Sequence, residues 1–282
     1  MADSTNPAGQ GPGNTVVDAP DSGFLPPLWH ERIGSGPLVL LLHGLSDTHG
    51  LWQHVAPTLA ERYTVVSIDH YAHGQSPLPG GQLTTAVMAD GVAQLIEQLG
   101  IGPAVVIGLS MGGGVAQVLT LRRPDLVRAL GLVSTSSEFK PANRERFRAR
   151  GEKAIREGMA SVIDETIPRW FTADWPAANP EAYRAVVDTV LANPPERFAA
   201  ASEANAERGW TDRLSEIRCP VLFVGGEQDP MGIEPVAASF RGHIPQARTV
   251  IVPAVSHLIP IQKPAELNAI LLDWLTEVAP AE

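Results

Sequence analysis

The chain has 282 residues, of which 44% are hydrophobic, enough for one large core with room for an inserted subdomain. Its net charge of −10 argues against nucleic acid or an anionic membrane as a partner, and no apolar segment is as long as a membrane span. The single cysteine excludes an internal disulfide, and no basic segment followed by an apolar one marks a secretory signal, so we expect a soluble cytoplasmic protein.

The first part of the chain predicts a tail followed by alternating strands and helices. Residues 1–24 are rich in Gly, Pro, Asp, Asn and Ser, and we expect them to be disordered except for a short strand at residues 15–17. Continuously apolar segments such as residues 38–42 are typical of strands that are buried on both faces. Strands are predicted at residues 28–33, 38–42, 64–68, 104–107 and 129–133, and helices at residues 52–62, 84–99 and 113–122.

The pattern changes after residue 134, where strand signals almost vanish until about residue 213. We therefore predict an α/β fold in which residues 25–134 and 214–282 form the core, with a mostly parallel sheet flanked by helices. A helical cap of residues 135–213 is inserted after the sixth strand of this prediction. The cap helices are predicted at residues 143–157, 159–166, 181–192 and 195–206; strands follow at 221–224 and 249–252, and a last helix at 265–278.

A serine lies at the tip of a predicted strand–turn–helix unit. The segment is Gly108-Leu109-Ser110-Met111-Gly112, which has the spacing G-x-S-x-G. This geometry lifts the serine hydroxyl above the sheet, beside the first free N–H groups of a helix. The pentapeptide alone is also compatible with a glycine-rich turn that a serine caps, so its context has to decide.

Two further polar residues follow predicted strands. Asp229 comes after the strand at 221–224 and His257 after the strand at 249–252. Because residues just past the carboxyl ends of parallel strands meet in one crevice, we predict that Ser110, Asp229 and His257 converge. Alone, the aspartate would be read as a turn residue before a proline, and the histidine as a satisfied loop residue.

Hydrolysis by a serine also needs donors for the oxygen anion that develops on the carbonyl. We predict that the backbone N–H groups of Leu45 and Met111 supply them, since one follows a buried strand and the other directly follows the serine. The eight histidines show no spacing typical of a metal site, and Gly112-Gly113-Gly114 lacks the spacing of a nucleotide-binding loop. We expect neither a metal nor another cofactor, and we attribute these glycines to close packing behind the turn.

Several segments carry a resemblance to a known family, and on them the chain resembles the α/β-hydrolase superfamily over nearly its whole length past residue 28. Within it, the chain is most similar to 3-oxoadipate enol-lactonases and related small lactonases and esterases. The segments are Leu42-His43-Gly44-Leu45, Gly108-Leu109-Ser110-Met111-Gly112-Gly113, Gly226-Glu227-Gln228-Asp229-Pro230, Ser256-His257-Leu258 and, in the cap, Glu157-Gly158-Met159-Ala160 and Arg169-Trp170-Phe171-Thr172.

The resemblance and the residues together give a functional hypothesis. We expect a serine hydrolase that acts on a small ester or lactone, with an enol-lactone favoured, through an acyl-enzyme on Ser110. The candidate pocket residues are Trp170, Phe171 and Leu258. Cleavage of a carbon–carbon bond in a vinylogous diketone and a small-molecule receptor on the same scaffold are the alternatives. The expected partner is a small-molecule substrate, and the sequence leaves open whether copies form a homo-oligomer.

Overall fold

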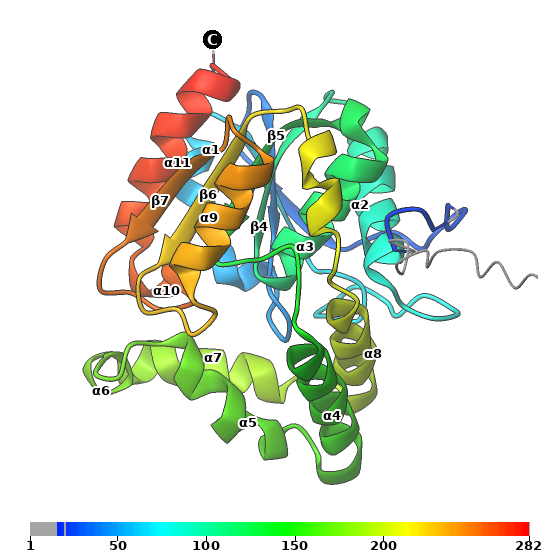
Figure 1. The fold of residues 1–282 in the computed structure, drawn as a ribbon, viewed down its shortest axis with the longest axis vertical. Helices are drawn as coiled ribbons and strands as arrows, with labels where there is room; N and C mark the ends of the chain where they lie inside the picture. The colour runs from blue at the N-terminus through cyan, green and yellow to red at the C-terminus, as the bar shows by residue number, and fades with distance from the viewer. Residues whose placement is uncertain (1–15, 20, 282) are drawn as a thin grey trace, which may run out of the picture.

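One seven-stranded sheet forms the centre of the computed structural model, which describes residues 16–19 and 21–281 (Figure 1). The strands lie in the order β1-β3-β2-β4-β5-β6-β7, and only β1 runs antiparallel to its neighbour. The sheet is therefore mostly parallel, which confirms the predicted fold class. The strands are β1 (His30–Ile33), β2 (Leu38–Leu42), β3 (Thr64–Ile68), β4 (Ala104–Leu109), β5 (Val127–Val133), β6 (Val221–Gly226) and β7 (Arg248–Val252).

Helices flank this sheet, and all residues of β2, β3 and β4 are buried, as expected for strands that are covered on both faces. Helix α1 packs with α11 and helix α2 with α3. None of the described helices has the length and apolarity that crossing a membrane requires. The helices of the core are α1 (Ala56–Ala60), α2 (Thr85–Leu99), α3 (Met111–Arg122), α9 (Ile233–His243), α10 (Ile259–Gln262) and α11 (Pro264–Val278), with 3₁₀ helices η1 (His49–Trp52) and η2 (Pro124–Leu126); a further 3₁₀ helix, η4 (Thr211–Glu216), spans the return from the inserted segment to the core.

The cap segment, residues 135–213, connects β5 to β6 and is helical. Figure 1 shows its helices gathered at one end of the sheet, with α4 beside α8. That end carries the carboxyl ends of β4 and β6, so the cap segment covers the edge where the predicted site residues lie. Its helices are α4 (Pro141–Glu157), α5 (Ala160–Thr166), η3 (Ile167–Trp170), α6 (Trp175–Ala178), α7 (Pro180–Leu191) and α8 (Pro195–Ala206).

The structure corrects the prediction for the first residues. The predicted strand at residues 15–17 is wrong, because Val16 and Val17 lie in a turn, while residue 15 lies outside the described residues. The cap segment therefore follows the fifth strand of the described chain and not the sixth. The expected disorder of residues 1–15 and 20 lies outside the described residues.

The described part of residues 16–24 is held against the core, which corrects the expectation of disorder there. The guanidinium of Arg122 donates to the carbonyl of Val17 over 3.1 Å, and Ser22 donates to Asp90 through its N–H and its hydroxyl. Val17 itself is buried. The composition of this segment suggested disorder, but it could not show that Arg122 and Asp90 of the core would form hydrogen bonds with it.

Prolines lie at two differences between the predicted and the observed helices. The predicted helix over residues 52–62 is shorter in the structure: η1 ends at Trp52, and α1 begins only at Ala56, with Pro57 in its first turn. Helix α9 was missed because Pro230, Gly232 and Pro235 are typical of a loop. Pro235 lies in the first turn of α9, where its missing N–H costs no hydrogen bond.

Candidate active site

A strained turn presents Ser110 at the end of β4. The strand ends at Leu109, α3 begins at Met111, and the serine between them has φ 52° and ψ −111°. The turn brings backbone so close that a Cβ on Gly112 would lie 2.4 Å from the carbonyl oxygen of Leu42. A Cβ on Gly108 would lie 2.4 Å from the carbonyl oxygen of Gly112. Both glycines of the motif are therefore required by the turn.

A hydrogen bond joins Asp229 to His257. Asp229 follows β6, His257 follows β7, and the distance from Nδ1 of the histidine to Oδ2 of the aspartate is 2.8 Å. The other carboxylate oxygen accepts the N–H of Met231 over 3.0 Å. Burial opposes ionisation of Asp229, but the charge and hydrogen bond of His257 outweigh it and hold the pKa of the carboxyl below its ordinary value. With Nδ1 engaged, Nε2 is the nitrogen that can accept a proton.

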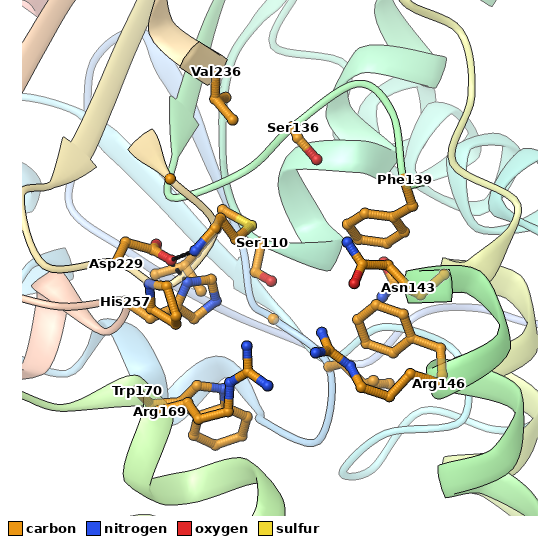
Figure 2. Close-up of a pocket in the computed structure, with 18 of the residues that line it drawn as sticks. Ser110, Ser136, Phe139, Asn143, Arg146, Arg169, Trp170, Asp229, Val236 and His257 are labelled. Carbon is orange, nitrogen blue, oxygen red and sulfur yellow. Dashed lines mark hydrogen bonds and ion pairs between the residues drawn. The ribbon is translucent and has the colours of Figure 1, made fainter. Parts of the chain in front are cut away.

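The three predicted residues line one cavity of about 770 Å³ (Figure 2). Ser110 contributes from the turn before α3, while Asp229 and His257 contribute from the loops after β6 and β7. Among the described side chains, no hydrogen bond joins the Ser110 hydroxyl to His257, whose Nδ1 is bound to the aspartate. The cap segment supplies the opposite wall through α4 and η3. The cavity thus lies between the carboxyl edge of the sheet and the cap segment.

The backbone on either side of Leu45 is fixed by buried histidines. Nδ1 of His43 lies 2.7 Å from the carbonyl oxygen of Gly44, and the N–H of Ser46 donates to Nε2 of His73 over 3.1 Å. Burial lowers the pKa of His73 to about 4, so its ring is neutral and accepts this hydrogen bond. Leu45 lines the cavity, and Met111 supplies the first N–H of α3. Leu45 thus lines the same cavity as Ser110, and Met111 follows the serine directly; the role of their N–H groups as donors stays a prediction.

Two of the three predicted pocket residues line the cavity. Trp170 and Leu258 do so, and the N–H of Leu258 donates to the carbonyl of Trp170 over 3.2 Å. The prediction for Phe171 is wrong: its ring is buried in the cap segment and stacks on Trp175, with centroids 4.5 Å apart and planes at 9°. Trp170 and Phe171 are adjacent in the sequence, but η3 ends between them. Trp170 therefore faces the cavity, whereas Phe171 packs inside the cap segment.

Three arginines of the cap segment line the cavity and were not assigned from the sequence. They are Arg146 and Arg150 on α4 and Arg169 on η3. Figure 2 shows the side chains of Arg146 and Arg169 projecting into the cavity. The signal was the spacing of four residues between the first two, which places them on one face of a helix. Arg148 lies on another face and pairs with Glu203 of α8, and the sequence did not show which face would point inward.

The three arginines are not neutralised by ion pairs among the described residues. Burial, and then the charge of Arg169, lower the pKa of Arg146. Burial, and then the charge of Arg146, lower the pKa of Arg150 to about 10. Because the three guanidinium groups lack an ion-pair partner among the described residues, they place an excess of positive charge at the cap side of the cavity.

Asp47 is a further cavity residue that the sequence analysis did not single out. It lies two residues after Leu45, and its Oδ1 accepts the N–H of Thr48 over 2.8 Å. Burial raises the pKa of Asp47 to about 7, with a smaller contribution from the charge of Asp69. In the described part of the chain, no cluster of three or more His, Cys, Asp and Glu side chains is placed to hold a metal ion.

The fold agrees with the proteins to which the chain is similar. Residues 37–264 match the family described as alpha/beta hydrolase fold. A 3-oxoadipate enol-lactonase of Acinetobacter baylyi is 25% identical over 232 residues, which cover 82% of this chain and 86% of that protein. A solved thermophilic esterase from Thermogutta terrifontis is 32% identical with a TM-score of 0.83, covering 89% of this chain and 94% of that one. The solved enol-lactonase from Burkholderia xenovorans is 26% identical with a TM-score of 0.84, covering 88% and 96%.

The chain belongs to the α/β-hydrolase family, and it is a hydrolase. Its similarity to enol-lactonases and esterases confirms the resemblance that the sequence motifs indicated.

Proposed function

We propose that this hydrolase cleaves a small ester or lactone through an acyl-enzyme on Ser110. His257 takes the proton of the serine hydroxyl through Nε2 as the oxygen attacks the carbonyl carbon. Asp229 holds the ring through Nδ1 and stabilises its charged form. The oxygen anion of the tetrahedral intermediate accepts from the N–H groups of Leu45 and Met111. His257 then protonates the departing alkoxide or enolate, and water removes the acyl group by the same steps.

The observation that carries this proposal is the convergence of three distant segments on one cavity. Ser110, Asp229 and His257 follow three different strands, and the 2.8 Å hydrogen bond between the last two leaves Nε2 as the basic nitrogen. The turn at Ser110 does not need His257 for its own structure, so the presence of an oriented histidine in the same cavity favours a catalytic role. The shared cavity and the oriented histidine support nucleophilic catalysis by serine, in which the base takes the proton of the hydroxyl as it attacks.

The positive wall of the cavity favours a substrate that carries a carboxylate. Arg146, Arg150 and Arg169 face a cavity in a chain whose net charge is −10, so the positive charge is local and not a property of the whole surface. Guanidinium groups bind carboxylates through paired hydrogen bonds. One similar protein is named for the enol-lactone of 3-oxoadipate, and the similar esterase structure has malate bound. We therefore favour an acidic lactone, such as an enol-lactone, over a neutral ester.

A substrate panel tests the reaction class. Purified wild-type protein and Ser110→Ala are incubated with lactones, enol-lactones, esters and a vinylogous diketone, and products are read by mass change. The proposal expects a gain of one water on a lactone or ester with wild type only. Diketone cleavage without lactone opening would assign the carbon–carbon alternative, tight binding without turnover would assign the receptor, and turnover by Ser110→Ala would remove the serine from its role.

Matched substrates test the acidic class. A lactone with a carboxylate side chain is compared with its methyl ester in wild type, Arg150→Met and Arg148→Met. Loss of one charge-assisted contact, worth about 1.5–3 kcal/mol, raises KM for the acid by roughly 10- to 100-fold in Arg150→Met. Arg148→Met removes the same charge from an outward face of α4 and leaves KM unchanged. Equal KM values for the acid in wild type and Arg150→Met would contradict the acidic class while leaving the reaction class intact.

A further inference from the structure

The carbonyl oxygen of Ser110 accepts three hydrogen bonds. The N–H of Gly114 donates over 3.2 Å, the hydroxyl of Thr135 over 2.7 Å, and Nη2 of Arg208 over 3.0 Å. The Thr135 oxygen in turn accepts from Nη1 of Arg208 over 3.1 Å. An ordinary α-helix supplies only the first of these donors. The other two come from outside the helix, and Arg208 touches both the carbonyl and the threonine.

The direction of this carbonyl fixes the direction of an N–H group in the cavity. The carbonyl of Ser110 and the N–H of Met111 belong to one planar trans peptide, so they point in opposite directions. Donors that hold the oxygen from behind therefore aim the Met111 N–H toward the developing oxygen anion. A charged donor on the oxygen also polarises the peptide and strengthens its N–H as a donor. Arg208 thus binds the oxygen of the Ser110–Met111 peptide, whose N–H is one of the two proposed oxyanion donors.

Arg208 is a buried charged residue whose burial calls for a functional explanation. Its side chain is 1% exposed, and among the described residues it has no carboxylate partner. Besides the contacts above, Nη2 donates to Oδ1 of Asn205 over 2.8 Å, and the guanidinium lies 4.5 Å from the centre of the Phe139 ring. Burial lowers the pKa of Arg208 to about 9, which leaves it charged at neutral pH. Burying an uncompensated charge is costly.

Two glycines that follow Ser110 leave space for the guanidinium of Arg208 and for the side chain of Thr135. A Cβ on Gly114 would lie 2.8 Å from Nη2 of Arg208, and a Cβ on Gly113 would lie 2.6 Å from Cγ2 of Thr135. The glycines after the serine therefore accommodate the two side chains that hold its carbonyl. This gives a specific reason for the close packing that we expected behind the turn.

Arg208 also stands where the cap segment joins the core. It follows α8 by two residues, its carbonyl accepts the N–H of Phe139 over 3.2 Å, and its neighbour Gly209 forms a bridge with Glu138. Both ends of the cap segment therefore pass beside it. The side chain extends from this junction to the Ser110 carbonyl.

From these contacts we propose that Arg208 is a positioning residue, which aims the Met111 N–H and adds its charge behind the oxyanion site. The proposal rests on the proposed function, because it needs Ser110 as nucleophile and Met111 as donor. Arg208 does not line the cavity, so it acts on the transition state through the Ser110–Met111 peptide and not by touching substrate. The proposal predicts that replacing Arg208 slows the attack of Ser110 without weakening the binding of the substrate.

The test uses the full-length protein and a fluorophosphonate probe, which reports attack by the serine without knowledge of the substrate. Labelling of Ser110 in wild type, mapped by mass spectrometry, establishes the nucleophile first; its absence would count against the proposed function and not against this inference alone. The second-order labelling rate is then compared for Arg208→Met, Arg208→Lys, Thr135→Val and Arg144→Met. Thermal unfolding of each variant identifies those that fold.

We expect Arg208→Met to label about 10- to 10²-fold more slowly, because losing a whole oxyanion donor costs about 10²-fold or more and Arg208 supports such a donor without being one. Arg208→Lys and Thr135→Val should fall between it and wild type, and they carry the test if Arg208→Met does not fold. Arg144 is the matched control, because it donates to the Phe139 carbonyl at the same junction but not to the serine, and Arg144→Met should label as wild type does.

A boronic acid that mimics the tetrahedral intermediate separates positioning from general structure. Its affinity should fall by the same factor as the labelling rate in each Arg208 variant, while the KM of a substrate from the panel stays near that of wild type. Folded Arg208 variants that label at the wild-type rate would overturn the proposal. So would equal losses in the Arg208 and Arg144 variants, because they would show that only the junction of the cap segment matters.

Discussion

At the scale of single residues, the proposed chemistry depends on which nitrogen of His257 is free. The bond to Asp229 engages Nδ1 and leaves Nε2 toward the cavity. The chain order serine, aspartate, histidine could be predicted from the sequence because each residue follows a strand whose apolar pattern is clear. The arginines of the cavity could not, since the orientation of α4 depends on packing with α8 and not on its own pattern.

Replacing Asp229 by Asn tests the role of this hydrogen bond. The amide can hold the ring in the wrong tautomer, with the proton on Nε2, so the nitrogen that should act as base no longer accepts a proton. We expect kcat to fall by about 10⁴-fold, as for the equivalent change in a serine protease, with little change in thermal stability. Steady-state kinetics on an ester from the panel measures this. A rate within a few fold of wild type would mean that another carboxylate orients the histidine.

Asp47 should give the affinity for an acidic substrate a dependence on pH. Because burial raises its pKa to about 7, the carboxyl is neutral below pH 7 and negative above it. The negative form repels a carboxylate substrate, so KM should rise as the pH increases from 6 to 8. In Asp47→Asn the KM should change less over this range, while a neutral ester serves as the control substrate. An identical pH dependence of KM in both proteins would rule out this contribution.

At the scale of elements, the turn between β4 and α3 positions Ser110, the proposed nucleophile. Its glycines could be predicted from the motif, and so could the strand and the helix, because a buried strand followed by glycines and a helix has a distinct pattern. The partners of the turn could not be predicted. Thr135 and Arg208 are 25 and 98 residues away from Ser110, and only the fold brings them to its carbonyl.

Substituting a glycine of this turn should disrupt the site more than the same change elsewhere. Gly112→Ala places a methyl group 2.4 Å from the Leu42 carbonyl oxygen, so β2 or α3 has to move and Ser110 is displaced. We expect a loss of about 2 kcal/mol or more of unfolding free energy, and activity lost beyond that effect. Chemical denaturation and ester hydrolysis measure the two.

Gly242→Ala in α9 is the matched control for this change. A Cβ there meets no atom within 4 Å, and alanine favours a helix, so stability should stay the same or rise by up to about 1 kcal/mol. Equal effects of the two substitutions would show that the close approach at Gly112 is not what limits the turn.

At the scale of the whole molecule, a cluster of neutral histidines supports the edge of the sheet beside Leu45. His43, His70 and His73 are fully buried, and their rings lie within 5.0 Å of one another through His43. Burial lowers the pKa of His70 to about 3 and that of His73 to about 4, and it lowers the pKa of His43 well below its ordinary value. The sequence showed three histidines near two turns, but only the fold places their rings together.

This cluster predicts how stability changes in acid. The folded protein keeps these rings neutral, whereas the unfolded chain protonates them below about pH 6.5. Stability from this source is complete above pH 6.5 and falls as the pH decreases toward 4, by about 1.4 kcal/mol per pH unit for each histidine. In His70→Phe, which keeps a ring but cannot take up a proton, the unfolding free energy should fall less steeply. Urea denaturation between pH 4 and 7 measures both slopes, and equal slopes would contradict this account.

The central claim is that Ser110 forms a covalent acyl-enzyme. It is tested most directly by quenching the protein in acid during turnover of a slowly hydrolysed ester or lactone, followed by peptide mapping with mass spectrometry. We predict an acyl adduct on the peptide that contains Ser110, present in wild type and absent in folded Ser110→Ala. Turnover by wild type with no adduct on that peptide, or with an adduct on another residue, would contradict the mechanism.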